Sequence, residues 1–221
     1  PAHINNRRSM RTPHHLGLVL LLAASPAAVH AQDPCGGYMH APPVGDWAEY
    51  QVSKEGEEEM GLRFAIVGTE QREGHEMQWF EMAITPEDDD DPVIMKLLVP
   101  TWPFEPAGLE EIIMKAGDNP AMNMGGPMMS TILKSIGDNP GLSVAEECRK
   151  MQEVGEESIT VAAGTLQTHH YRNAESGAEA WLSSEVPFGM VRSTDGEYTS
   201  ELVAHGDGAT TAITETPQDL F

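Results

Sequence analysis

MQWFEMAI, at residues 77–84, is the third of four short apolar runs that together decide the fold. The other three are WAEYQV at 47–52, LRFAIV at 62–67 and VIMKLLV at 93–99. All four are rich in β-branched and aromatic residues, and turn-forming sequences such as QREG at 71–74 separate them, which is typical of short strands. Because no crossover helix lies between neighbours, we expect consecutive strands to pair as an antiparallel meander.

The middle of the chain, residues 105–151, changes character and predicts short helices. LEEIIMKA at 109–116 places acidic residues early and a lysine late, as the helix dipole prefers, and Gly117 stands where a helix C-cap is expected. A second helix is expected over 130–136. A third, over 143–151, opens with a serine followed three residues later by a glutamate, which is the capping-box pattern.

The last third of the chain returns to the strand pattern. Strands are expected over residues 158–161, 165–172, 179–182, 189–192, 198–205 and 209–214. The order of strands, then helices, then strands indicates an α+β domain dominated by a single antiparallel sheet. The predicted architecture is therefore one strongly curved sheet, an incomplete β-barrel, whose concave face is covered by short helices from the central insert.

The N-terminus has the pattern of a secretory signal peptide. Arg11 precedes an apolar run at 16–24, and VHA at 29–31 offers small residues at the two positions that a signal peptidase reads. The apolar run is too short to span a bilayer, which needs about 20 residues. We expect Met10 to be the start, with residues 1–9 as an overhang. Export to the periplasm or the extracellular space, with cleavage near Ala31, follows from this pattern.

Beyond the signal peptide at 1–31, we expect one domain with short flanks. A linker at 32–43 precedes the domain at 44–215, which contains the helical insert at 105–151, and a tail at 216–221 follows. The chain holds 35 acidic and 13 basic residues, for a formal net charge of −22. A charge of this sign repels phosphate backbones, so nucleic acid is excluded as an expected partner. No other segment is apolar enough for an integral membrane protein.

Cys35 and Cys148 are the only two cysteines. In an oxidising compartment two cysteines most often pair with each other. Their spacing is not that of a structural zinc site, which needs four ligands. We therefore expect a disulfide that ties the start of the mature chain to its middle.

Two C-terminal segments resemble a known family. They are VAAGTL at 161–166, which leads to HYR at 170–172, and WLSSEVPFGMV at 181–191. They are similar to uncharacterised exported bacterial proteins related to the periplasmic lipoprotein carriers, the LolA-like half-barrels. The resemblance implies an incomplete barrel closed by helices over an apolar cavity that holds lipid chains. Ala162 stands where the family has proline, and no strand arginine matches a lipid-releasing residue, so no functional residue carries over.

Histidines and a run of acidic residues are the candidate metal ligands. His169 and His170 are adjacent and therefore face opposite sides of a strand, so at most one of them can join His205 on a face. The run at 87–91 has five acidic residues but lacks the alternating oxygens and the glycine of a calcium loop. We expect polar strand histidines and a solvated loop rather than a metal site.

The chain has thirteen methionines, and five of them lie close together in the sequence. Thioethers can bind Cu(I), but methionine is also an adaptable filler of apolar cavities, and the second interpretation is favoured. With one isoleucine and two tryptophans, these methionines are the residues expected to line or cover a cavity: Trp79, Met114, Met122, Met124, Met128, Met129, Ile132 and Trp181.

These observations favour a non-enzymatic exported carrier for an apolar ligand, such as a lipid or a lipoprotein acyl chain, with no cofactor. No serine has the Gly-x-Ser-x-Gly setting of a nucleophile elbow. One alternative is a structural or protein-interaction module with a packed interior, and a metal-binding protein or a hydrolase is the third. An interior lined by Met, Leu and Ile with an opening would favour the carrier, whereas converging histidines and carboxylates would favour the third class.

Overall fold

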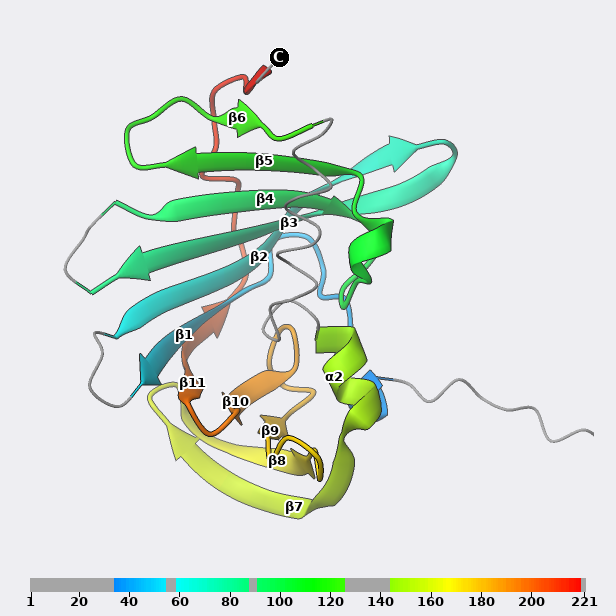
Figure 1. Ribbon diagram of the computed structural model, residues 1–221, viewed down its shortest axis with the longest axis vertical. Helices are drawn as coiled ribbons and strands as arrows, with labels where there is room; N and C mark the ends of the chain where they lie inside the picture. The colour runs from blue at the N-terminus through cyan, green and yellow to red at the C-terminus, as the bar shows by residue number, and fades with distance from the viewer. Residues whose placement is uncertain (1–33, 55–58, 88–90, 126–143, 220–221) are drawn as a thin grey trace, which may run out of the picture. The chain divides into compact units, whose positions relative to one another are not determined.

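One open sheet, antiparallel at every ladder but one, dominates the computed structural model, which describes residues 34–54, 59–87, 91–125 and 144–219 (Figure 1). The first half contributes β1 (Trp47–Lys54), β2 (Met60–Arg72), β3 (His75–Pro86), β4 (Val93–Val99), β5 (Glu111–Ala116) and β6 (Met122–Asn123). The second contributes β7 (Gln152–Val161), β8 (Gly164–Arg172), β9 (Glu179–Leu182), β10 (Met190–Thr194), β11 (Tyr198–Gly206) and β12 (Gln218–Asp219). The strand order is β12-β6-β5-β4-β3-β2-β1-β11-β10-β9-β8-β7, so the sheet is not closed.

The expected meander of the first four strands is confirmed. β1, β2, β3 and β4 pair in sequence order, each antiparallel to the next. Arg72 pairs with His75 across a two-residue turn in which Glu73 and Gly74 both have positive φ, 50° and 84°. That backbone is the one a tight hairpin needs, because its twist matches that of the flanking strands. The turn therefore sets the register of β2 against β3 as far as Gly68 and Trp79, beyond which a bulge between Gly68 and Ile66 shifts the pairing by one residue.

The expected helix over 109–116 is wrong, because this segment forms strand β5. Ile112 and Ile113 are both buried, and in a strand they point to opposite faces. A strand that is buried on both faces reads as a continuous apolar run, which periodicity alone cannot distinguish from a buried helix. Gly117, taken as a helix cap, has φ 51° in the turn after the strand.

The expected cover of insert helices is therefore not found in the part of the chain that the structure describes. The third helix is confirmed as α2 (Val144–Lys150), and it is the one α-helix among the described residues. Two short 3₁₀ turns accompany it, η1 (Pro34–Gly37) and η2 (Pro106–Gly108). The second expected helix, over 130–136, lies outside the described residues. None of the helices in the described ranges has the length and apolar character needed to cross a bilayer.

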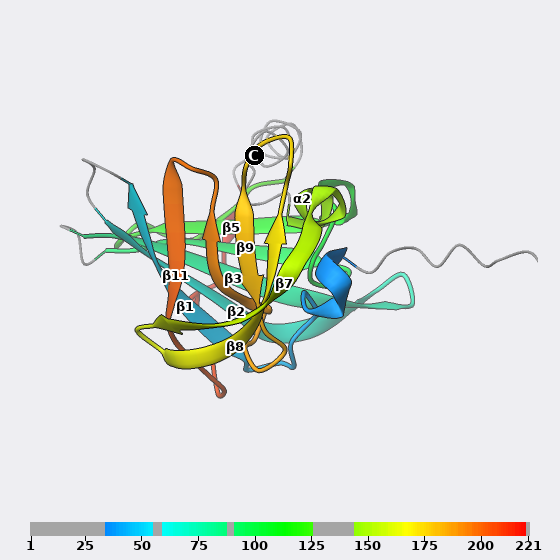
Figure 2. The same ribbon diagram turned by 90° about the horizontal axis from the view of Figure 1, so that it is seen from below.

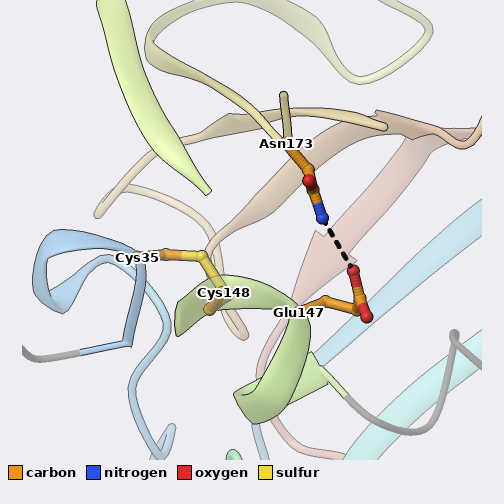
Figure 3. The surroundings of a disulfide bond; sticks show 4 residues. All are labelled: Cys35, Glu147, Cys148 and Asn173. Carbon is orange, nitrogen blue, oxygen red and sulfur yellow. Dashed lines mark hydrogen bonds between the residues drawn. A yellow bond between two sulfur atoms is a disulfide. The ribbon is translucent and has the colours of Figure 1, made fainter. Parts of the chain in front are cut away.

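The expected disulfide is present between Cys35 and Cys148, whose Cα atoms lie 5.0 Å apart (Figure 3). It joins η1 to α2, which lie side by side (Figure 2). Both cysteines are buried in the main core. Beside the bond, Asn173 after β8 donates from Nδ2 to Glu147 of α2 at 3.4 Å. The two short elements are thus held against the interior by one covalent link and by polar contact.

The last expected strand, over 209–214, is wrong in its pairing. The segment 207–217 forms no ladder and instead crosses one face of β3, β4 and β5 before the chain ends in β12, which pairs with β6 in parallel (Figure 1). We call this segment the C-terminal strap. The face of the sheet that it covers is called the outer face. The opposite face, which carries the main core, is called the inner face. Ile213 of the strap is buried against Ile94 and Ile113.

Polar contacts hold the strap to the outer face. Glu81 of β3 is buried, and its carboxylate accepts hydrogen bonds from Thr211 Oγ1 at 2.6 Å and from the Ala212 backbone N–H at 3.0 Å. Farther along, Lys115 Nζ lies 2.6 Å from Glu215 Oε1. Buried polar groups need such partners, because leaving one unsatisfied costs about 1–3 kcal/mol. The strap therefore closes the outer face with specific contacts as well as with Ile213.

Candidate functional site

The register of β2 to β6 aligns the apolar side chains of the inner face into three rows. The closed row is Ile66, Phe80, Leu97 and Ile112, each opposite the next across the ladder. The methionine row is Phe64, Met82, Met95, Met114 and Met122. The rim row is Leu62, Ile84, Val93 and Ala116. Directly opposed side chains in a sheet are in contact distance, so each row is a continuous apolar strip.

Burial falls from one row to the next. All four residues of the closed row are 0% exposed. In the methionine row, Phe64 and Met82 are buried, whereas Met95, Met114 and Met122 are half-buried. In the rim row no residue is buried, and Val93 is exposed. The inner face therefore has a closed end and an open end, and the methionine row lies between them.

Aromatic rings fill the closed end. Trp102, from the connection between β4 and β5, lies with its ring centroid 4.8 Å from Phe80 and 5.4 Å from Phe188. Phe104 from the same connection lies 6.1 Å from Phe80. Such tilted and edge-to-face pairs are favourable for aromatic side chains. This end is a packed core, whereas Met95, Met114, Met122 and the rim row are only partly covered.

The loop between β9 and β10, which carries the second family-like segment, supplies part of this packing. Val186 and Phe188 are buried in the main core, and Phe188 has a positive φ of 65°. Gly189 follows with φ 78°, and a Cβ there would lie 2.1 Å from the carbonyl oxygen of Tyr38. Only glycine allows so close an approach. The segment that follows η1 and contains Tyr38, called here the N-terminal segment, therefore lies directly against this loop.

Three of the residues expected from sequence lie in or beside the methionine row. Met114 and Met122 oppose each other in the methionine row, and Met124 is buried beside it, its backbone N–H donating to Ile112 at 2.8 Å. Sequence proximity missed Met82 and Met95, which complete the row from β3 and β4. No signal in the sequence identifies them, because the β3–β4 and β4–β5 registers that align them with Met114 cross longer connections.

The other expected residues do not join this group. Trp79 points to the outer face, where its Nε1 donates to Glu70 at 3.1 Å and Lys96 lies 4.7 Å above its ring. Trp181 lies on β9, outside the three rows, and its ring stacks on His170 at 4.5 Å. Met128, Met129 and Ile132 lie outside the described residues.

The three histidines considered as metal ligands, His169, His170 and His205, lie in three different environments. His169 lies between Tyr38, whose Oη is 2.6 Å from Nε2, and Glu153, whose Oε1 is 2.8 Å from Nδ1. Nearby, burial, reinforced by Glu153 and Tyr38, raises the pKa of Tyr171 to about 12. These contacts link the N-terminal segment to β7 and β8.

His170 belongs to a different environment from His169. Its Nδ1 lies 3.4 Å from Glu157, on the side of Trp181. His205 lines a third location, a surface pocket shared with His40, Asp46 and Asp207. Burial and the neighbouring Asp207 raise the pKa of Asp46, although His40 opposes the shift. Within the described ranges, no group of three or more His, Cys, Asp or Glu side chains is arranged to hold a metal ion.

Comparison with known proteins gives a limited result. No protein-family model and no curated protein matches the chain. Several solved structures are similar to it, including three at low identity. A candidate lipoprotein from Parabacteroides distasonis has a TM-score of 0.37 and 11% identity, covering 76% of this chain and 98% of its own.

The other two structures have similarly low TM-scores and sequence identities. A candidate exported protein with a YmcC-like fold from Bacteroides fragilis has a TM-score of 0.35 and 8% identity, over 76% of this chain and 99% of its own. MucB has a TM-score of 0.35 and 10% identity, over 77% of this chain and 55% of its own. With TM-scores this low, the likeness decides neither the family nor the function.

Proposed function

We propose that the chain is an exported, non-enzymatic binding protein that shelters an apolar ligand, such as a lipid acyl chain, at the open end of the inner face. The observation that carries the proposal is the fall in burial from the closed row to the rim row. The signal-peptide pattern at residues 1–31 supports export.

Half-buried apolar rows give the energetic basis for binding. Removing apolar surface from water is favourable by about 25 cal/mol per Å². A ligand laid along Met95, Met114 and Met122 would cover surface that the described chain leaves half-exposed. Methionine side chains are flexible and polarizable, so they adapt to ligands of irregular shape. The site would therefore select for apolar character and tolerate variation in chain shape.

Charge around the site favours ligands without a strongly anionic head. Lys96 and Lys115 lie on β4 and β5, but both side chains are on the outer face, over Trp79 and against Glu215. The three rows contain no basic residue. With a net charge of −22, the protein also repels free anions. We expect neutral or weakly polar ligands whose binding depends little on salt.

The test is titration with a fatty probe whose fluorescence rises in an apolar environment. Saturable binding is expected for the wild type, and Met114→Asp and Val93→Asp should each weaken it about tenfold or more, because burying a carboxylate against the probe is costly. Val93 is already exposed, so its variant should fold even if the Met114 variant does not. Val154→Asp on β7, another exposed valine, is the matched control.

Two outcomes would contradict the proposal. If the folded wild type shows no saturable binding, the packed protein-interaction module is the better description. If Val154→Asp weakens binding as much as Val93→Asp, the effect comes from added charge rather than from the inner face. Circular dichroism of each variant establishes that it is folded before the titration is interpreted.

A further inference from the structure

Four adjacent strands each place a methionine at the same level of the inner face. Met82 on β3 opposes Met95 on β4, Met95 opposes Met114 on β5, and Met114 opposes Met122 on β6. Opposed side chains in an antiparallel pair have Cβ atoms about 4.5–5.5 Å apart. Each methionine adds three rotatable bonds beyond its Cα, so neighbouring thioethers can turn toward a common point.

The methionine row differs in composition from the two rows beside it. Strand interiors favour β-branched and aromatic residues over flexible side chains. The closed row follows this preference with isoleucine, phenylalanine and leucine, and the rim row uses leucine, isoleucine, valine and alanine. Only the middle row of the three has sulfur on all four strands from β3 to β6. The feature that sets this row apart is its thioether sulfur, which can act as a soft metal ligand.

We propose that the methionine row binds one Cu(I) ion through the thioethers of Met95, Met114 and Met122. Soft thioether ligands select Cu(I) over hard cations such as Mg²⁺ and Ca²⁺. These three side chains are half-buried, so an ion can reach them from the open end, whereas Met82 is buried behind them. Neutral ligands leave the ion its positive charge, which the strongly acidic chain favours.

This site is independent of the apolar-ligand proposal, and one set of variants separates the two. Leucine keeps the volume and apolar character of methionine but has no sulfur, and such swaps usually cost less than about 1.5 kcal/mol of stability. A triple variant, Met95→Leu, Met114→Leu and Met122→Leu, should therefore lose the metal site and stay folded, whereas binding of the fatty probe is tested separately with Val93→Asp in the rim row, which contains no sulfur. Failure of copper binding alone would leave the carrier proposal intact.

The experiment is an anaerobic titration of the full chain with Cu(I) against a chromogenic Cu(I) chelator. The wild type is expected to bind one equivalent of Cu(I). The triple variant should bind Cu(I) at least about tenfold more weakly, because its soft ligands are gone. The control carries the same three changes elsewhere in the core, at Met39, Met151 and Met190, and should bind like the wild type. If the triple variant does not fold, Met114→Leu alone should still show weakened binding.

The pH dependence identifies the ligand type. Thioethers do not titrate, so the affinity should be the same at about pH 5 as at about pH 7.5, whereas a histidine site would weaken as imidazole protonates. An affinity that falls at the lower pH, or a triple variant that binds Cu(I) as tightly as the wild type, would overturn the proposal.

Discussion

The two faces of β3, β4 and β5 are covered in different ways. On the outer face, the C-terminal strap lies across the strands, buries Ile213 and satisfies the carboxylate of Glu81. On the inner face, Trp102 and Phe188 close one end, while the methionine and rim rows stay half-buried. The same three strands are thus sealed by the chain itself on one side and only partly on the other.

The covered regions of these strands are expected to contribute mainly to stability, and the partly exposed rows are expected to contribute mainly to binding. The closed row and the outer-face cluster of Ile94, Ile113 and Ile213 have the dense packing of a folded core. The open rows have apolar surface that is still accessible, which is the usual character of a ligand site. Three experiments test where the boundary between the two regions lies.

The largest effect is expected from removing the disulfide, which anchors η1 and α2 on the inner side. Cys35 and Cys148 are separated by 113 residues, and a closed loop of that length is worth about 4–5 kcal/mol in the chain-entropy model. The double variant Cys35→Ser and Cys148→Ser should unfold at much lower urea. Reductant added to the wild type should reproduce the loss. An unfolding midpoint that neither treatment lowers would show that the bond contributes little.

A pair of alanine variants on β4 compares the closed row with the methionine row. Leu97→Ala removes a fully buried side chain and should cost about 2–5 kcal/mol, whereas Met95→Ala, on the same face, should cost clearly less because its side chain is already half-exposed. Urea unfolding measures the free energy of unfolding of both variants, provided that the dependence of that free energy on urea concentration has the same slope in each. Equal losses would mean that Met95 is as tightly packed as Leu97 and that the inner face has no open end.

The smallest effect concerns the outer face and depends on pH. The hydrogen bond from Lys115 is the main cause that lowers the pKa of Glu215 below its ordinary value of 4.5. A lowered carboxyl pKa contributes stability above the unfolded value and loses it as pH falls through the folded value. Glu215→Gln should therefore be slightly less stable than the wild type at neutral pH and equal to it in strong acid. Glu175→Gln, on an exposed loop, should show no such dependence; a deficit that persists in acid would rule out the ion pair as its cause.

The N-terminal meander could be predicted because each strand has its own pattern and the connections are short. β5 could not, since LEEIIMKA contains good helix formers, and the two buried faces erase the alternation that would identify a strand. At 209–214 the alternation was real, with Ile213 buried between exposed neighbours, but it reflects packing on the outer face rather than pairing. The alternation of apolar and polar residues indicates which side chains are buried. It does not indicate whether the segment pairs with a neighbouring strand.

The candidate site was predicted only in part for the same reason. Met114 and Met122 were identified because methionines are dense in that stretch of sequence. Met82 and Met95 were not, because their relation to Met114 exists only through the registers of β3 to β4 and β4 to β5. Trp79 was expected to line the cavity, yet a shift of one residue places it on the opposite face from Phe80.

The strap also bears on how the chain folds. Thr211 reaches Glu81 across 130 residues of sequence, so the outer cover is among the most non-local contacts of the molecule. Contacts of long sequence separation carry a large loop-closure cost before they return any stability. Without the strap, Ile94 and Ile113 would lack the cover of Ile213, and the buried carboxyl group of Glu81 would lack its two hydrogen-bond donors. The strap thus completes both the apolar and the polar contacts of a surface that the earlier strands would leave unfinished.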